Sequence, residues 1–482
     1  MADAQSFKHP KVFYMIFMLE IWERFGYATV IAIAVLFFVQ GIGLTNSQAF
    51  VLFGAYSSLM YGFIVLGGFI GDNILGAKRT IVLGLLVMLV GYLLLGFGDI
   101  NTVYWAMALI CVGTGLFKSN PSSLLAKCYP TDNPQLIHNA FTMFYMAINI
   151  GAVLGLFFSP LISKHYGFQT SFVVAAIGMV LALVTFAFSK NSLSHIHTAA
   201  GKRALNYRYL AVTLISLVVL VYITELMLKH VLYAQITVWI VSAVVIGAFL
   251  KKTSEQVSVQ RRRMILALIL MAEAIVYKIL YVQMQTSINF YAINNVEHSL
   301  FGFSITAQSF QSLNPFWIIV MSPVLAYYYM KSKDTRFGFS IYNKFAIGML
   351  LCGLAFISLY FSRFFANDEG VVSAGWLVLS YGLQSTGELL ISGLGVAMVA
   401  ELVPAAMSGF AMGMWFVFLA IGSMLGGHVA SLVSTEGEVL QNDKLHTLIS
   451  YTDVFLVIGI CTLVFAMIMF SSTKLKAKLI GK

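Results

Sequence analysis

Charged residues are scarce in this sequence. Only 10% of its 482 residues are Asp, Glu, Lys or Arg, whereas 60% are hydrophobic. An ordinary soluble domain carries about 25% charged residues. The scarcity of charge therefore excludes a typical soluble protein and predicts a chain that crosses a membrane many times.

Cysteine and the motifs of enzymes are also rare or missing. The four cysteines lie in or at the ends of apolar segments and none is spaced as CxxC, so we expect buried thiols rather than metal or redox sites. We find no phosphate-binding loop, no cluster of metal ligands and no nucleophile with a base at supporting spacing. We therefore expect neither an enzyme nor a cofactor.

Apolar runs long enough to cross a bilayer, which takes about 20 residues, recur along the whole chain. The runs are 12–42, 48–72, 79–98, 102–127, 138–162, 169–189, 209–228, 231–250, 264–291, 308–330, 340–362, 372–403, 407–432 and 450–471. They predict an all-α polytopic membrane protein with 14 transmembrane helices. We expect no cleavable signal peptide, because the first run is too long and carries charges.

The positions of the 29 Lys and Arg predict the orientation. If the N-terminus is cytoplasmic, only four of them lie on the opposite side, namely Lys164, Lys229, Arg363 and Lys444. Three lie within the membrane, namely Arg24, Lys118 and Lys278. All others are cytoplasmic, as the positive-inside rule requires. This bias explains the net charge of +10 without nucleic acid and predicts that both termini are cytoplasmic.

The runs are grouped as six, two and six, which is typical of the major facilitator architecture with two six-helix bundles around a cavity. We predict an N-terminal bundle at 1–189, linkers with an inserted helix pair at 190–263, and a C-terminal bundle at 264–482. The glycine-rich stretch from Gly68 resembles the superfamily's cytoplasmic latch, with gating roles for Asp72 and Arg79. A plain basic anchor would explain Arg79 but not the glycine and aspartate spacing.

Three charges interrupt the first apolar run, in the stretch Glu20-Ile-Trp-Glu23-Arg24-Phe-Gly-Tyr27. An ionised side chain near the bilayer centre costs at least about 2.5–3.5 kcal/mol. Glu20, Glu23 or Arg24, and Tyr27 recur at helical spacing and share one face. That face must therefore look into protein or a water-filled cavity, and we interpret it as part of a transport site that binds protons.

Two other runs of the first half carry polar side chains at depth. Lys118 lies too far from the membrane surface to reach it easily, so its expected partner is Glu20 or Glu23. A static ion pair between helices is the alternative. Tyr145 and Asn149 are four residues apart and share a helix face. We expect a ligand role for Asn149, although a membrane Asn also serves as interhelical glue.

In the second half, Glu388 stands mid-membrane among glycines, and we expect it to bind ligand or protons. Asn314 precedes Pro315, where we expect a kink with freed backbone groups. Glu273 and Lys278 are five residues apart, which is poor spacing for a mutual pair, and their roles stay open. We interpret Tyr61, Tyr281, Gln283, Ser392 and Trp415 as lining the same cavity, with plain packing as the alternative for Tyr61 and Trp415.

Together these residues resemble the proton-coupled oligopeptide transporter family over essentially the whole chain. The first-run stretch is similar to its ExxERFxYY signature, and the stretch from Phe144 to Gly151 is similar to FYxxINxG. Positions matching the family's helix 4 lysine, its two substrate-binding asparagines and its helix 10 glutamate are Lys118, Asn149, Asn314 and Glu388. The helix pair at 209–250 resembles the insertion of bacterial members.

There are four departures from the family pattern. Ala28 replaces the second signature tyrosine, which predicts a different side-chain or peptide-length preference. The second run has no histidine, so the histidine used by mammalian members cannot carry the proton here. Gln285 stands where relatives tend to have proline, and Lys278 where they tend to have an aromatic residue.

The resemblance implies a proton-coupled symporter that imports di- and tripeptides by alternating access. It implies proton coupling through Glu20, Glu23, Arg24 and Lys118. It implies substrate binding by Arg24, Tyr27, Tyr61, Lys118, Tyr145, Asn149, Tyr281, Gln283, Asn314, Glu388, Ser392 and Trp415. We expect a monomer in the bacterial inner membrane, with peptide, protons and lipid as partners.

Two other functions are compatible with the pattern. A transporter of the same fold could carry nitrate, a drug or another small amphiphile. A membrane receptor that does not transport is the second alternative, but it would not need protonatable carboxylates in its centre.

Overall fold

The computed structural model describes residues 9–129, 134–189, 192–193, 196, 200–203, 206–300, 302–332, 340–404, 407–433 and 443–479. Five cationic residues used above to predict the orientation lie outside these ranges: Lys8, Lys190, Lys333, Arg336 and Lys482.

The described chain is almost entirely α-helical, as the apolar runs predict. Twelve of its helical segments are long and apolar enough to cross a membrane. The two remaining predicted runs correspond to α12, Leu313–Ser332, and α14, Gly375–Leu402, which have 20 and 28 residues. In the described part, two short strands, β1 (Ser299–Leu300) and β2 (Phe303–Ser304), pair as an antiparallel hairpin. The prediction of an all-α polytopic membrane protein is confirmed.

The chain divides into two compact units. The first comprises residues 1–30, 62–155 and 165–229, and the second comprises residues 31–61, 156–164 and 230–482. Three helices contribute residues to both units: α1 (Lys11–Gln40), α2 (Asn46–Phe69) and α6 (Pro134–Tyr166). The predicted bundle boundaries at 1–189, 190–263 and 264–482 stay a prediction.

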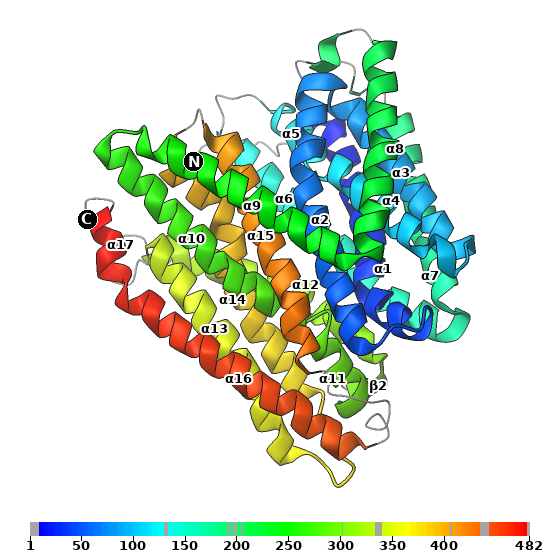
Figure 1. Ribbon diagram of the computed structural model, residues 1–482, viewed down its shortest axis with the longest axis vertical. Helices are drawn as coiled ribbons and strands as arrows, with labels where there is room; N and C mark the ends of the chain where they lie inside the picture. The colour runs from blue at the N-terminus through cyan, green and yellow to red at the C-terminus, as the bar shows by residue number, and fades with distance from the viewer. Residues whose placement is uncertain are drawn as a thin grey trace, which may run out of the picture. The chain divides into compact units, whose positions relative to one another are not determined.

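In the first unit, helix α3 packs against α4 and α7, and α8 packs against α4 (Figure 1). The remaining elements of this unit are η1 (Ile70–Ile74), α3 (Ala77–Phe97), η2 (Ile100–Thr102), α4 (Val103–Lys118), α5 (Asn120–Ala126), α7 (Phe168–Phe188), η3 (Ala200–Lys202) and α8 (Tyr207–Lys229).

Helix α13 has the corresponding place in the second unit, with α14 and α16 as neighbours, while α10 packs against α15 (Figure 1). Besides α12, α14 and the hairpin, the unit contains α9 (Val231–Ser254), α10 (Ser258–Gln283), α11 (Ser287–Asn295), η4 (Ala307–Ser312), α13 (Ile341–Ser362), η5 (Arg363–Phe365), α15 (Ser408–Ser431), α16 (Lys444–Ser471) and α17 (Thr473–Leu479).

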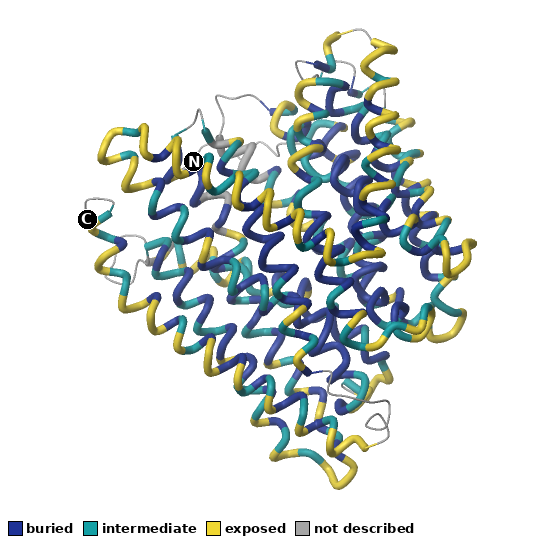
Figure 2. Tube along the Cα trace, in the orientation of Figure 1, coloured by how far each residue is buried: buried dark blue, intermediate teal, exposed yellow. Residues whose placement is uncertain are grey.

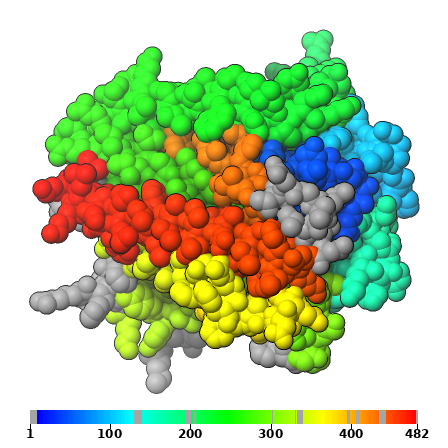
Figure 3. Space-filling view, turned by 60° about the horizontal axis from the view of Figure 1, so that its bottom comes forward, coloured from blue at the N-terminus to red at the C-terminus, as the bar shows by residue number. Residues whose placement is uncertain are grey.

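Side chains on the outer faces of the helices are apolar. Figure 2 shows exposed and buried positions alternating along α16, which lies next to α13 on the surface seen in Figure 3. The exposed positions include Val218 of α8, at 70%, and Val457 of α16, at 61%. Apolar residues exposed around whole helices are expected where lipid tails replace water.

Two predicted runs are interrupted in the structure. The run 102–127 divides at Ser119 into α4 and α5, and the run 264–291 divides at residues 284–286 into α10 and α11. The second break lies beside Gln285, whose backbone N–H donates to the carbonyl of Val282 at 3.1 Å. The chain therefore turns here without a proline.

The expected kink at Pro315 takes a different form. Helix α12 begins at Leu313, directly after η4, so Pro315 stands in its first turn, where proline is well tolerated. The proline inside this helix is Pro323.

The start of the helical segment around α4 is stabilised by Asp99. Its carboxylate accepts hydrogen bonds from the backbone of Asn101 and Thr102, at 3.1 and 3.2 Å. The side-chain hydrogen bond from Asn101, together with these backbone bonds, holds the pKa of Asp99 below its ordinary value. Asp99 lies between two candidate spanning segments, so the cap fixes the residue at which the second of them begins.

Candidate functional site

The centre of the first unit's polar cluster is an ion pair within α1. Glu23 and Arg24 are 0% and 5% exposed. The guanidinium of Arg24 donates from Nε to Oε2 of Glu23 at 2.5 Å and from a terminal nitrogen to Oε1 at 2.6 Å. Neighbouring positions on a helix do not normally face each other. The long arginine side chain nevertheless curls onto the carboxylate and forms a bidentate pair, the strongest arrangement for these two groups.

Tyr27 connects this pair to α4. The guanidinium carbon of Arg24 lies 4.6 Å from the Tyr27 ring centre, and the ammonium of Lys118 lies 5.8 Å from it. Glu20 is buried and close enough to Glu23, Arg24 and Lys118 to interact with each electrostatically. The structure therefore brings together all four residues predicted to couple protons, with one tyrosine ring facing both cations.

Helix α6 approaches α1 closely at this level. A Cβ at Gly151 would lie 2.5 Å from the carbonyl oxygen of Ile21 and 2.8 Å from the Cβ of Arg24. Two residues earlier, Asn149 is buried and its Nδ2 donates to the carbonyl of Tyr145 at 2.8 Å. Tyr145 itself is 39% exposed. The glycine thus allows α6 to pack closely against the helix that carries Arg24.

The second unit has its own polar cluster, around Glu388 of α14. Asn314, in the first turn of α12, donates from Nδ2 to Oε2 of Glu388 at 2.8 Å and to the hydroxyl of Ser385 at 3.0 Å. The hydroxyl of Tyr277 also donates to Glu388. The carboxylate is therefore held by neutral donors from two other helices.

Lys278 lies close to this cluster, on α10. Its ammonium donates to the hydroxyl of Tyr61 at 3.1 Å and lies 3.9 Å from the ring centre of Tyr281. The open question of a pair between Glu273 and Lys278 is thereby answered, since Glu273 instead bonds to Lys476 of α17.

Three further residues were predicted to line the cavity, namely Gln283, Trp415 and Ser392. The amide of Gln283 is fully buried, donates to two backbone carbonyls at 3.0 Å and accepts from Ser287 at 2.7 Å. Its hydrogen bonds link α10, α11 and α15 to one another. Because the amide is used within the protein, its placement does not support substrate binding. Trp415 is buried against the backbone of Gly395, which favours packing. Ser392 is half-buried one helical turn after Glu388.

The residues predicted to latch the cytoplasmic ends do not contact each other among the described interactions. Asp72 is exposed within η1. Arg79 donates to the backbone carbonyls of Leu75 and Arg203, at 3.2 and 3.1 Å. The nearby Lys78 donates to the carbonyl of Leu193. The basic pair therefore fastens the segment that follows α7 onto the start of α3.

Three partners of the site were missed in the sequence. They are Ser385 and Tyr277, which contact the Asn314 and Glu388 pair, and Lys476, which neutralises Glu273. Ser385 could have been found from its position three residues before Glu388, on the same helix face. Tyr277 and Lys476 carry no such local signal, because their partners are far away in sequence.

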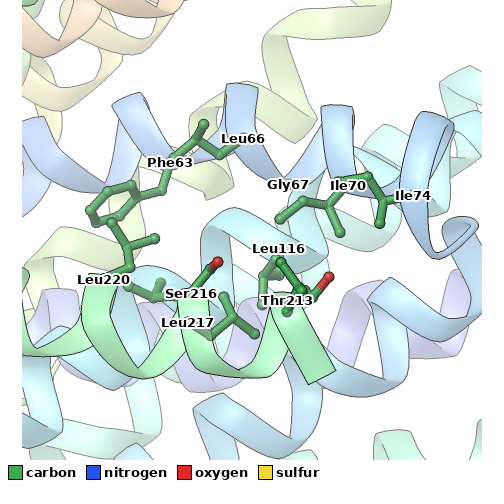
Figure 4. Close-up of a pocket in the computed structure, with 12 residues that line it drawn as sticks. Phe63, Leu66, Gly67, Ile70, Ile74, Leu116, Thr213, Ser216, Leu217 and Leu220 are labelled. Carbon is green, nitrogen blue, oxygen red and sulfur yellow. The ribbon is translucent and has the colours of Figure 1, made fainter. Parts of the chain in front are cut away.

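A cavity of about 300 Å³ lies in the first unit (Figure 4). It is lined by α2, η1, α4 and α8 and includes Phe63, Leu116 and Leu217, with hydroxyls from Thr213 and Ser216. None of the predicted site residues lines it. Its lining is apolar, and it offers no charged group to a polar ligand.

The fold and these clusters define a class of protein. Ionisable residues buried inside helical membrane spans are expensive and are characteristic of ion and substrate pathways. The profile of the POT family matches residues 78–445 of the chain. The chain belongs to the POT family.

Curated relatives match over nearly the full length. Dipeptide and tripeptide permease B of Yersinia enterocolitica is 44% identical over 466 residues, which cover 96% of this chain and 94% of the relative. Dipeptide and tripeptide permease A of Escherichia coli K12 is 43% identical, with coverage of 96% and 92%.

Solved structures are similar as well. The crystal structure of tetrameric PepTSo2 is 32% identical, covers 97% of this chain and 98% of its own, and superposes with a TM-score of 0.86. The crystal structure of peptide transporter POT in complex with sulfate is 28% identical, covers 99% and 97%, and has a TM-score of 0.82. This likeness confirms the predicted major facilitator fold.

Proposed function

We propose that the protein imports di- and tripeptides together with protons by alternating access. The observation that carries this proposal is that the protein holds ionisable groups of both signs within its helices. A short peptide is a zwitterion, with a positive amine at one end and a negative carboxylate at the other. The first unit carries two buried or half-buried cations, Arg24 and Lys118, and the second carries the half-buried carboxylate of Glu388. The peptide names of the relatives support the same substrate class.

The two ends of a peptide would bind to different groups. Arg24 and Lys118 suit its carboxylate, because a guanidinium and an ammonium both donate charge-assisted hydrogen bonds. Glu388 suits its amine. Asn149 and Asn314 supply amide groups for the peptide backbone. Since only the ends and the backbone are recognised, side chains of many kinds would be accepted, whereas longer peptides would bind weakly.

Proton binding would act on the ion pair in α1. Glu23 now occupies two donors of Arg24. Protonation of Glu23 or Glu20 removes the negative charge that holds Arg24 and Lys118, and frees these cations for the substrate. The carboxylates and cations titrate as one group, so a pH profile would report the cluster rather than one residue. Binding drives the change of state only through contacts that differ between states.

The energy available is sufficient for moderate accumulation. One pH unit contributes about 1.4 kcal/mol per proton. Each elementary charge moved through 100 mV contributes about 2.3 kcal/mol. Since about 1.4 kcal/mol corresponds to a tenfold concentration ratio, one pH unit alone lets each co-transported proton concentrate the substrate about tenfold.

The test is uptake of labelled Ala-Ala into proteoliposomes with an inward proton gradient. We expect gradient-dependent uptake by the wild type. Glu20→Gln should retain only exchange down the peptide gradient, and Glu388→Gln should lose binding. Glu255→Gln, at an exposed position after α9, is the matched control and should behave as the wild type. A folded wild type without Ala-Ala uptake would contradict the proposal.

The surrounding assignments belong to the same proposal. We propose a transporter without enzymatic activity, with a functional unit of one chain, in a bacterial inner membrane with both termini in the cytoplasm. The charge distribution along the sequence supports this orientation. Competition by dipeptides against nitrate or drugs would separate the peptide function from other substrates of the same fold.

A further inference from the structure

Lys278 is held firmly inside the second unit. It is 5% exposed on α10. Helix α15 packs against its stem at Gly422, where an added Cβ would lie 2.6 Å from the Cβ of Lys278. The glycine therefore makes room for the lysine side chain and limits the directions in which it can point. A lysine buried this way is not a residue that reaches toward the membrane surface.

The ammonium of Lys278 is surrounded by neutral groups. It donates one hydrogen bond, to Tyr61, and lies 3.9 and 4.9 Å from the ring centres of Tyr281 and Tyr61. No carboxylate of the described residues lies within 4.0 Å of it. The two aromatic faces attract the cation through their ring quadrupoles. They do not replace an anion, and an ammonium has three donors to satisfy.

Glu388 is near Lys278 but is not in contact with it. The two groups interact electrostatically, yet the carboxylate is bonded to Asn314 and Tyr277. The two groups are thus close but unpaired, and each is held by its own neutral partners. A ligand that carries a positive and a negative group a few bonds apart could bind both without separating an existing pair.

We propose that Lys278 is a subsite for an acidic side chain on the first residue of the peptide. This inference rests on the proposed function, in which Glu388 binds the α-amine. An N-terminal Asp or Glu carries its carboxylate only a few bonds from that amine, which matches the proximity of Lys278 to Glu388. The preferred substrates would then be peptides that begin with an acidic residue.

A second explanation makes a different prediction. If Lys278 served only as an internal counter-ion for Glu388, it would weaken the attraction of every peptide amine equally. Its removal would then strengthen binding of all peptides by the same factor. The ratio of the affinities for acidic and neutral peptides separates the two explanations, because a general loss of structure or charge changes both affinities alike.

The experiment is competition against labelled Ala-Ala in proteoliposomes by Glu-Ala, Gln-Ala and Ala-Glu. The wild type should bind Glu-Ala about tenfold more tightly than Gln-Ala, the value expected for one hydrogen bond to a charged group. Ala-Glu, with the acid at the other end, should not share this advantage. Lys278→Gln should abolish the difference, and Lys278→Arg should keep most of it.

Lys344→Gln is the matched control. Lys344 is also a lysine over a tyrosine ring, 3.8 Å from the ring centre of Tyr329, but on α13. It should leave the Glu-Ala to Gln-Ala ratio unchanged. The proposal is overturned if the wild type does not prefer Glu-Ala, a result that does not depend on any variant folding. It is also overturned if Lys278→Gln changes the affinities for Glu-Ala and Gln-Ala by the same factor. Failure of Ala-Ala uptake itself would instead contradict the proposed function.

Discussion

Arg24 shows how a single buried charge is kept in the membrane. Its guanidinium binds one carboxylate in a bidentate manner and faces one aromatic ring. A lysine has the same charge but cannot form two parallel bonds, because its donors converge on one nitrogen. The identity of this cation therefore matters as much as its charge.

Arg24→Lys tests this point. We expect peptide uptake to fall by about 10- to 100-fold, since one charge-assisted hydrogen bond of about 1.5–3 kcal/mol is lost. Uptake is measured in proteoliposomes, and thermal unfolding in detergent shows whether the variant is folded. Wild-type uptake by Arg24→Lys would show that charge alone suffices at this position.

At the scale of helices, close approach decides which side chains meet. Helices α1 and α6 approach each other at Gly151, where any side chain would meet the backbone of Ile21. This approach sets the distance between α6 and the helix that carries Arg24, although the two helices come from different predicted runs.

Gly151→Ala should destabilise the protein by about 1–3 kcal/mol, because the added methyl group must displace α1. It should also lower uptake, since α6 and α1 carry site residues. Thermal unfolding in detergent measures the first effect. Gly247→Ala is the control, because nothing lies within 4 Å of the added atom in α9. Equal melting temperatures for the two variants would refute the packing argument.

The short helix α17 is fastened to α10 by a buried ion pair. Lys476 bonds to Oε1 of Glu273, and both side chains are nearly inaccessible. The second oxygen of Glu273 has no hydrogen-bond partner in the described structure. Removal of one partner from such a pair leaves an uncompensated charge.

Lys476→Met should therefore destabilise the protein by about 3–5 kcal/mol, whereas the double variant Glu273→Gln/Lys476→Met should recover most of that loss. Both are measured by thermal unfolding in detergent. A double variant as unstable as the single one would show that α17 is held by its packing and not by the ion pair.

At the scale of the whole molecule, the question is how many chains form the functional unit. A structural relative is described as tetrameric, whereas all residues that we assign to the site come from one chain. If one chain is sufficient, proteoliposomes that receive mixtures of wild type and Glu388→Gln should show uptake proportional to the wild-type fraction. A curve that falls with a higher power of that fraction would indicate cooperating chains.

Part of this protein's structure could be predicted from local sequence. Hydropathy predicted where the membrane-spanning segments lie, and twelve described segments are long and apolar enough to cross a membrane. It could do so because each helix satisfies its own backbone hydrogen bonds and depends on its own residues. Helical spacing placed Glu20, Arg24 and Tyr27 on one face for the same reason. These properties depend only on residues within a few turns.

Only the tertiary structure decided how the buried charges are paired. Lys278 meets Tyr61 across 217 residues, and Glu273 meets Lys476 across 203. Gln283 is used within the protein because α15 brings the carbonyl of Gly426 within 3.0 Å of it. Such contacts arise from the packing of whole helices, and the free energy that selects them is shared among many distant residues. Local sequence does not contain that information.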